Sequence, residues 1–339
     1  MRKFIVLALV VILSLSLVAC GQSNDNSGSE GSNQTDNSQE NSQQKIKLGI
    51  IQIVEHDALD AAREGFLDVL AENGWKDGEN LIVDYQNAQG DMPTANTIAK
   101  KFVSDKVDLV LAIATPTAMA MAGATEDIPI LITAVTDPVG SQLVNSMEKP
   151  GTNVTGTTDM NPVKEQLQLL QKLVPEVKNV GIIFNTSEQN SQIQVEIARQ
   201  AAPELGLKLV EAVATNSSEV MQAAQSLVGK VDAIYVPTDN TVVSACESVI
   251  KVSEDEKIPV VSGESSVVKK GGLATVGIDY YKLGRQTGEM ALEVIAGKDP
   301  AEMPIQKQKE MSVVINKKAA EFLGIEIPED ILEDAEIVE

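Results

Sequence analysis

Residues 106–117 read KVDLVLAIATPT, and this stretch decides the fold because residues 230–240, KVDAIYVPTDN, repeat its pattern. In both copies the tripeptide Lys-Val-Asp precedes a short apolar run, and a Pro-Thr pair follows that run. Short apolar runs that alternate with longer helical patterns are typical of parallel strands joined by crossover helices. The repetition, 124 residues along the chain, therefore predicts two similar α/β lobes.

Two further pairs of apolar runs recur in the same order. Residues 47–53 (KLGIIQI) correspond to residues 179–184 (NVGIIF), and residues 128–131 (IPIL) correspond to residues 258–261 (IPVV). The offsets are 132 and 130 residues, close to that of the first pair. Every α/β protein repeats strands, but three pairs in one order and at similar spacings indicate a duplicated architecture rather than chance.

The fold class we expect is therefore α/β with two similar lobes, each a parallel sheet flanked by helices, joined by a hinge that the chain crosses more than once. Residues 159–162 (DMNP) separate the two copies, and Pro162 restricts the residue before it to extended conformations, so this segment is a hinge candidate. The expected organisation is a signal peptide at 1–19, a lipidated cysteine and tether at 20–44, a first lobe at 45–160 plus about 283–305, a second lobe at 161–282 plus about 306–325, and an acidic tail at 326–339.

The N-terminus has the pattern of a secretory signal. Arg2 and Lys3 precede an apolar run that is shorter than the roughly 20 residues of a membrane-spanning helix. Residues 17–20, LVAC, resemble a bacterial lipobox, in which the cysteine, here Cys20, is diacylated and becomes the mature N-terminus. The alternative is an ordinary signal peptide that is cut nearby, with Cys20 incidental.

The stretch that follows supports lipidation. Residues 21–44 contain only Gly, Gln, Ser, Asn, Asp, Glu and Thr, so they have nothing to bury and form a tether. We expect an extracytoplasmic protein that a lipid anchor holds at the cell membrane.

Composition excludes several classes of function. Removal of residues 1–19 takes away Arg2 and Lys3, which leaves 25 basic and 49 acidic side chains and a net charge of −24. Nucleic acid is therefore not an expected partner, because its phosphates would be repelled. With Cys20 lipidated, Cys246 is the one remaining cysteine and His56 the one histidine. The sequence thus lacks the usual clusters of zinc ligands, and we expect neither a metal ion nor a cofactor.

Several motifs carry a resemblance to a known family. Residues 277–286 (GIDYYKLGRQ) and 297–300 (GKDP) resemble the closing segment of type I periplasmic binding proteins. Residues 52–65, 87–91, 133–138 and 238–241 resemble the branch of ABC-transporter substrate-binding lipoproteins that includes tryptophan, tyrosine and phenylalanine binders. The resemblance covers residues 45–323.

This resemblance implies a binding protein without enzymatic activity. It implies that the two lobes close around a small amino-acid-like ligand, with an aromatic amino acid as the narrower option, and that an ABC permease in the membrane is the partner of a monomer. The alternative is a ligand-sensing lipoprotein of the same fold that signals to a membrane receptor.

Ligands of open parallel sheets bind beyond the carboxyl ends of the strands. The loops expected there hold carboxylates, amides and hydroxyls, and no Lys or Arg, so the ligand should be neutral, cationic or zwitterionic. For an amino acid, Asp239 or Asp137 would meet the ammonium, and Thr115, Thr136 or Ser191 the carboxylate. The candidate ligand contacts are Glu55, Asn87, Thr115, Thr136, Asp137, Asn185, Glu188, Asn190, Ser191, Asp239, Asn240 and Asp279.

Each candidate also has an ordinary structural interpretation. Asp and Asn residues that follow strands are often helix caps or turn formers. We expect no catalytic residue, and we expect His56, between Glu55 and Asp57, to be a solvated turn residue or a contact at a helix start. Cys246 is expected to be a small buried residue of a helix.

Overall fold

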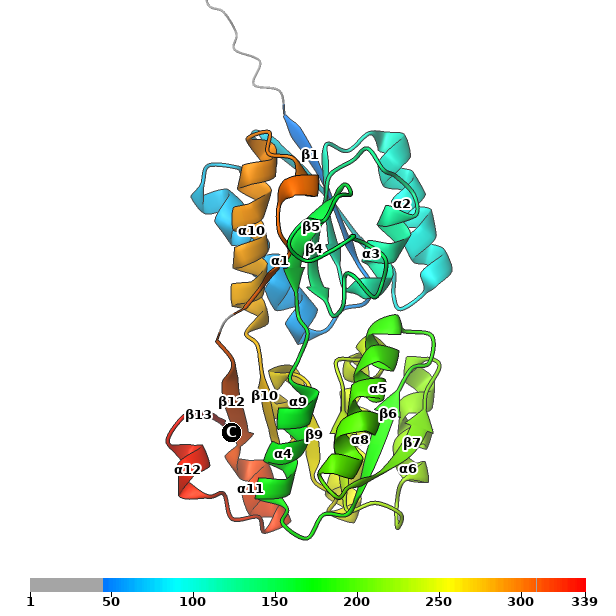
Figure 1. The fold of residues 1–339 in the computed structure, drawn as a ribbon, viewed down its shortest axis with the longest axis vertical. Coiled ribbons are helices and arrows are strands. Elements are labelled where there is room, and N and C mark those ends of the chain that lie inside the picture. The colour runs from blue at the N-terminus through cyan, green and yellow to red at the C-terminus, as the bar shows by residue number, and fades with distance from the viewer. Residues whose placement is uncertain (1–44, 309) are drawn as a thin grey trace, which may run out of the picture. The chain divides into compact units, whose positions relative to one another are not determined.

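The computed structural model describes residues 45–308 and 310–339, which form two α/β lobes (Figure 1). The predicted fold class of two lobes, each with a largely parallel sheet and flanking helices, is confirmed. The expected signal peptide, Cys20 and the tether lie outside the described residues. No helix within residues 45–308 and 310–339 is both long enough and apolar enough to cross a membrane.

The first lobe has a six-stranded parallel sheet in the order β11-β5-β4-β3-β1-β2. Its elements are β1 (Ile46–Gln52), α1 (Asp57–Glu72), β2 (Leu81–Asn87), α2 (Met92–Asp105), β3 (Leu109–Ile113), α3 (Thr115–Ala122), β4 (Ile130–Val135), β5 (Val154–Thr158), α10 (Tyr280–Ile295), the 3₁₀ helix η2 (Pro300–Glu302) and β11 (Gln306–Lys307).

The second lobe has a seven-stranded sheet in the order β13-β12-β10-β9-β8-β6-β7, in which only the β10–β12 pair is antiparallel. Its elements are α4 (Val163–Leu173), β6 (Asn179–Phe184), α5 (Gln189–Glu204), β7 (Lys208–Val213), the 3₁₀ helix η1 (Ser217–Glu219), α6 (Val220–Ser226), β8 (Ala233–Val236), α7 (Asn240–Ser244), α8 (Cys246–Glu256), β9 (Val260–Ser262), α9 (Ser265–Lys269), β10 (Ala274–Gly277), β12 (Ser312–Asn316), α11 (Lys317–Leu323), α12 (Glu329–Leu332) and β13 (Ala335–Val338).

The repeated Lys-Val-Asp motif has the same role in both lobes. The Oδ2 atom of Asp108 accepts a hydrogen bond from the backbone N–H of Lys47 at 2.8 Å, and Oδ2 of Asp232 accepts one from the N–H of Asn179 at 2.7 Å. Each aspartate thus satisfies a donor at the start of the lobe's first strand. The duplication seen in the sequence therefore reflects a repeated structural unit.

A glycine in the first strand of each lobe allows a helix to pack closely. A Cβ atom on Gly49 would lie 2.7 Å from the ring of Phe102, and one on Gly181 would lie 2.6 Å from Leu227. Both distances are shorter than any van der Waals contact, so a larger residue would push the packed side chain away. These two glycines are 132 residues apart, as the strand repeat predicts.

Alternate residues of the central strands face separate apolar clusters. Ile182 of β6 belongs to one buried cluster of the second lobe, and its neighbour Ile183 belongs to another. Such a strand is covered on both faces, which explains why its sequence is continuously apolar rather than alternating.

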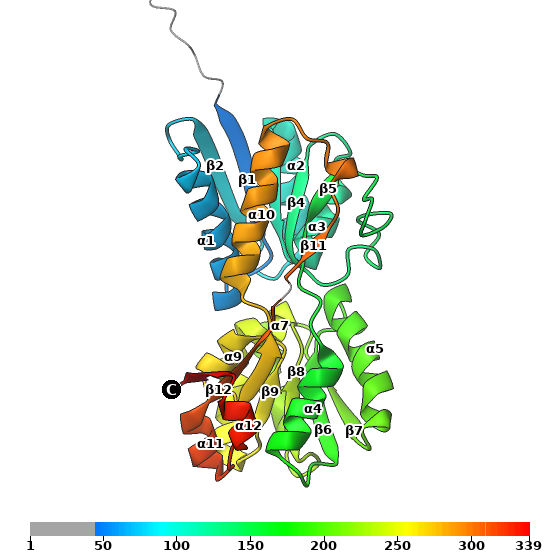
Figure 2. The same cartoon turned by 60° about the vertical axis from the view of Figure 1, so that its left-hand side comes forward.

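The chain passes between the lobes three times, after β5, after β10 and after β11 (Figures 1 and 2). The prediction of more than one crossing is confirmed. Residues 159–162, the hinge candidate, form the first of these connections and lead from β5 into α4.

Two details of the expected lobe boundaries differ in the structure. Gln306 and Lys307 form β11 and pair with β5, so the segment expected to begin the return to the second lobe still belongs to the first sheet. The expected acidic tail at 326–339 contains α12 and β13, and β13 pairs with β12. A sequence pattern could not show this because four residues of an exposed edge strand give little apolar signal.

Helix α10 returns late in the chain to pack on α1 of the first lobe (Figure 2). Glycines make the contact possible: a Cβ atom on Gly284 would lie 1.9 Å from the carbonyl oxygen of Ala62, and one on Gly65 would lie 2.2 Å from that of Tyr281. The two backbones therefore touch directly, which fixes the start of α10 beside the start of α1. Residues from both helices line the cavity described next.

Candidate ligand-binding cavity

A small cavity of about 10 Å³ lies between the lobes, near the carboxyl ends of their strands. This is room for about one water molecule, so the lobes or the lining side chains must move apart before a ligand the size of an amino acid can enter. Its lining residues come from both lobes and are His56, Leu59, Ala134, Thr136, Asp159, Asn190, Thr238, Asp239, Asn240, Val243, Glu264 and Tyr280.

Asp239 is anchored within the second lobe. Its Oδ1 atom accepts a hydrogen bond from the N–H of Val242 at 2.8 Å and so caps α7, which lies where the second lobe meets the first in Figure 2. Its Oδ2 atom accepts hydrogen bonds from the N–H of Asn185 at 2.5 Å and from Oγ of Ser191 at 2.6 Å. Burial, together with the nearby negative charge of Glu188, raises the pKa of Asp239 to about 7.

Glu188 organises the neighbouring polar groups. Its Oε2 atom accepts hydrogen bonds from the side chain of Asn190 at 3.0 Å and from the backbone of Asn240 at 3.0 Å. Its Oε1 atom accepts two more from the backbone and hydroxyl of Thr241, at 2.9 and 2.7 Å. Glu188 does not itself line the cavity, but it holds two residues that do.

The amide of Asn190 is held in one orientation. Its Nδ2 atom donates to the carboxylate of Glu188 and to the carbonyl oxygen of Thr238 at 2.9 Å, so both of its hydrogens are used. A flipped amide would place oxygen against oxygen at both contacts. The Oδ1 atom is buried and has no hydrogen-bond partner. Asn190 thus presents an unused acceptor in the lining of the cavity.

Asp159 lies on the first connection between the lobes. Its two oxygens accept hydrogen bonds from the hydroxyls of Thr136 at 3.1 Å and Tyr280 at 2.8 Å. Burial is the main reason that the pKa of Asp159 rises to about 6, since no cationic partner offsets the cost of removing the carboxylate from water.

His56 is the residue just before α1, and its side chain is buried rather than solvated as the sequence suggested. Neither ring nitrogen has a hydrogen-bond partner, and Nδ1 lies 3.9 Å from Oε1 of Glu264. Burial lowers the pKa of His56 to about 4, so the imidazole is neutral at pH 7, and burial raises the pKa of Glu264 to about 7. The expectation of a helix-start position is met; the expectation of solvent exposure is wrong because the second lobe covers the ring.

The electrostatic character of the cavity follows from these groups. Three buried carboxyl groups line it, and within the described part of the chain neither Lys nor Arg does. A bound anion would be repelled, whereas a ligand ammonium would replace the missing counter-charge. The carboxylate oxygens and Oδ1 of Asn190 can accept further hydrogen bonds, and an ammonium group has several N–H donors to supply them.

Comparison with known proteins identifies the family. The model of a family described as ABC transporter substrate binding protein matches residues 47–339. The chain belongs to this family. It is 46% identical over 326 residues to the tyrosine-binding protein of Clostridioides difficile, with 96% of this chain and 93% of that one covered.

Two solved structures bear on the arrangement of the lobes of this substrate-binding protein. A Streptococcus pneumoniae ABC domain in complex with L-Trp is 40% identical, with a TM-score of 0.84 over 87% of this chain and 100% of that one. A ligand-free, open substrate-binding protein with adhesive properties from Clostridium difficile is 49% identical, but its TM-score is 0.66 over 87% of this chain and 99% of that one. Over the whole chain this structure is therefore more similar to the tryptophan complex than to the open protein, although the open protein is the more identical in sequence. The fold is that of type I periplasmic binding proteins.

Eight of the twelve residues expected at the ligand lie at the cavity or directly behind it. The lining includes Thr136, Asn190, Asp239 and Asn240. The supporting residues are Thr115, which accepts a hydrogen bond from the N–H of Thr136, and Asn185, Glu188 and Ser191, described above. Contact of any of them with a ligand remains a prediction.

The other four lie outside the cavity of the substrate-binding protein, and each has a local structural role. Glu55 is exposed and accepts a hydrogen bond from Tyr85, and Asn87 accepts one from the N–H of Gln89. Asp137 accepts one from the N–H of Gly140 in a turn, and Asp279 caps α10. The structure thus gives each of these four residues a local contact, and their contact with a ligand stays a prediction.

Eight lining residues were absent from the expected contacts, and four of these have ionisable side chains: His56, Asp159, Glu264 and Tyr280. Asp159 lies on a connection between the lobes and Tyr280 begins α10 directly after another, and a sequence does not show which way such side chains point. Glu264 lies two residues after the end of β9, so the rule that places ligands at the carboxyl ends of strands could have predicted it.

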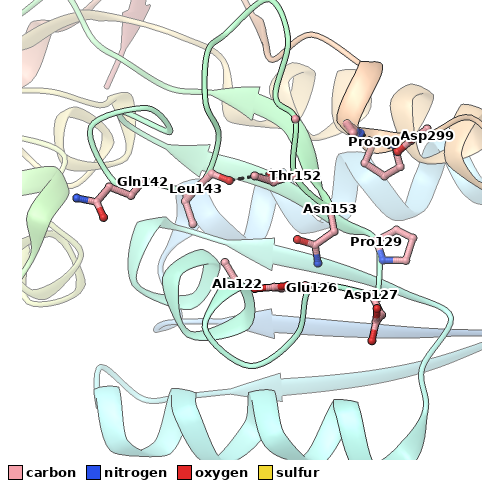
Figure 3. Close-up of a pocket in the computed structure, with 12 residues that line it drawn as sticks. Ala122, Glu126, Asp127, Pro129, Gln142, Leu143, Thr152, Asn153, Asp299 and Pro300 are labelled. Atoms are coloured by element: carbon pink, nitrogen blue, oxygen red, sulfur yellow. Dashed lines mark hydrogen bonds between the residues drawn. The ribbon is translucent and has the colours of Figure 1, made fainter.

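A larger open hollow of about 590 Å³ lies elsewhere on the first lobe (Figure 3). Pro129 and Asn153, which line it, immediately precede β4 and β5, so the hollow is at the amino ends of these strands. Ligands of parallel sheets bind at the opposite ends. The smaller enclosed cavity is therefore the better candidate for the ligand site.

Proposed function

We propose that this substrate-binding protein holds a single amino acid with a free ammonium group, and that the amino acid is aromatic. The observation that carries the proposal is the enclosed cavity with three buried carboxyl groups and, among the residues of the described chain, no lysine or arginine in its lining. The names of two relatives, a tyrosine-binding protein and a structure in complex with L-Trp, support the aromatic side chain.

In this proposal the ammonium contacts Asp159 and Oδ1 of Asn190, with Asp239 nearby. Asp159 is hydrogen-bonded to Thr136 and Tyr280 of the first lobe, and Asn190 belongs to the second, so one ammonium between them would hold the lobes together. Ligand binding would then stabilise the closed arrangement by the difference in its affinity for the closed and open forms.

We further propose that the protein is lipidated on Cys20 and delivers its ligand to an ABC permease as part of an importer. The sequence of residues 17–20 and the polar stretch that follows support the anchor. Membership of the ABC transporter substrate-binding family supports the permease as partner.

Isothermal titration calorimetry of the purified protein with L-tyrosine, L-tryptophan, L-glutamate and N-acetyl-L-tyrosine tests the ligand. Tyrosine or tryptophan should bind, and N-acetyl-L-tyrosine should bind at least about 100-fold more weakly because it lacks the cation that the carboxylates require. Glutamate should not bind, since its second carboxylate would meet the buried acids. Equal affinity for tyrosine and its N-acetyl derivative would refute the proposed ammonium site.

A further inference from the structure

His56 is an unsatisfied polar residue in an otherwise well-bonded cavity. The residue is 7% exposed, and although the side chain of Asn240 lies nearby, neither nitrogen of the ring has a hydrogen-bond partner. The nearest acid, Glu264, is 3.9 Å from Nδ1, which is too long for a hydrogen bond. A buried donor and acceptor without partners destabilise the protein, so a ligand is the natural source of the missing partner.

The protonation state of His56 defines what that partner must offer. Burial lowers its pKa to about 4, so the ring is neutral at physiological pH. A neutral imidazole has one N–H that donates and one nitrogen that accepts. It therefore matches a hydroxyl group, which does both, or an N–H group, which donates.

The position of His56 indicates that it would contact the side chain of the ligand rather than its ammonium or carboxylate group. The ammonium has acceptors in Asp159 and Asn190, so it does not need the imidazole. A ligand carboxylate that reached His56 would lie close to Glu264 and would oppose the ionisation of this buried acid, so the place is less suited to an anionic group than to a neutral one. Leu59, in the first turn of the helix that His56 precedes, also lines the cavity and provides an apolar surface beside the imidazole.

We propose that His56 recognises the polar atom of an aromatic side chain, the phenol hydroxyl of tyrosine or the indole N–H of tryptophan, and so selects these ligands against phenylalanine. This inference rests on the proposed function. Phenylalanine would fill the same apolar space but would leave both nitrogens of His56 buried and unpaired, and sites built for a hydrogen bond strongly reject a ligand that lacks it.

The test compares the affinities for L-tyrosine, L-tryptophan and L-phenylalanine in the unaltered protein and in His56→Leu, by calorimetry. The unaltered protein should bind tyrosine at least about tenfold more tightly than phenylalanine. His56→Leu should weaken tyrosine and tryptophan binding by about tenfold or more and leave phenylalanine unchanged or tighter, so that the preference disappears. His56→Gln, which keeps a donor and an acceptor, should retain part of the preference.

Glu64→Gln, an exposed change on the same helix, is the matched control and should alter none of the affinities. Thermal unfolding of each variant checks that it folds. A tyrosine to phenylalanine ratio that is the same in His56→Leu as in the unaltered protein would overturn the inference. An equal loss of affinity for all three ligands in His56→Leu would also overturn it, because His56 would then contact the ammonium or carboxylate group that the three ligands share. Failure of all three to bind the unaltered protein would instead refute the proposed function.

Discussion

The hydroxyl group of Tyr280 donates a hydrogen bond of 2.8 Å to Oδ2 of Asp159 and thereby joins two of the three connections between the lobes. Asp159 follows β5 on the first connection, and Tyr280 begins α10 after the second. The same carboxylate lines the cavity, so a group that binds Asp159 also contacts the hinge. Asp239 differs, because its hydrogen bonds all remain within the second lobe.

Asp159→Asn should therefore weaken binding of the proposed amino acid more than the substitution of an uncharged residue that only supports Asp159. Removal of one partner from a buried charge pair costs about 2 to 5 kcal/mol, or roughly 30-fold to several-thousand-fold in affinity. Tyr280→Phe removes only a supporting hydrogen bond and should cost about tenfold or less. Calorimetry with L-tyrosine measures both, and an Asp159→Asn protein with unchanged affinity would exclude Asp159 from the ammonium site.

The stability of the ligand-free protein should rise as the pH falls from 7.5 to 5.5. The pKa values of Asp239 and Glu264 are raised to about 7 and that of Asp159 to about 6, all above the values of an unfolded chain. The folded state therefore binds more protons than the unfolded state in this range, and acidification favours it. The pKa of His56 is lowered to about 4, so this residue makes the folded state less stable on acidification, but its single contribution opposes those of three carboxyl groups.

Thermal unfolding in the absence of ligand measures this effect, with Asp159→Asn as the comparison. The variant should show a smaller rise between pH 7.5 and 5.5 because one of the three carboxyl groups is missing. Bound ligand should reduce the rise as well, since an ammonium stabilises the ionised carboxylates. A melting temperature that falls steadily with pH over this range would contradict the assignment of three raised pKa values.

The architecture was predictable from the sequence because it depends on repeated local patterns. The pairs Asp108 and Asp232, and Gly49 and Gly181, have equivalent contacts in the two lobes, and strand spacing alone aligned them. Parallel strands that are buried on both faces give continuous apolar runs, which are easy to recognise.

The cavity was predictable only in part because it depends on contacts between distant segments. Asn190 and Asp239 follow strands directly, and the general rule for parallel sheets found them. Asp137 follows a strand as well, yet its side chain turns back to the N–H of Gly140. His56 is buried only because the second lobe covers it, and no local pattern in the sequence encodes that contact.

Gly284→Ala should destabilise the first lobe severely. The new Cβ atom would lie 1.9 Å from the carbonyl oxygen of Ala62, which is backbone and cannot move without separating α10 from α1. Overpacking of this kind costs about 3 kcal/mol or more. Gly297→Ala is the control: nothing lies within 4 Å of its Cβ position, so only the strain of its positive φ, about 1 kcal/mol, is expected. Urea unfolding measures both, and equal effects would show that the α1–α10 contact tolerates a methyl group.

The lipid anchor is tested by Cys20→Ala in the producing cell. If the cysteine is acylated, the unaltered protein should sediment with membranes and the variant should not, because residues 21–44 contain no apolar side chain that could replace the lipid. Metabolic labelling with a fatty acid should mark the unaltered protein alone. Calorimetry on the variant is the necessary control, and its affinity for the amino acid should be unchanged because the cavity is formed entirely by residues from His56 onward. A variant that still sediments with membranes would refute Cys20 as the anchor, and an unaltered protein that does not sediment would favour a signal peptide that is cut without lipidation.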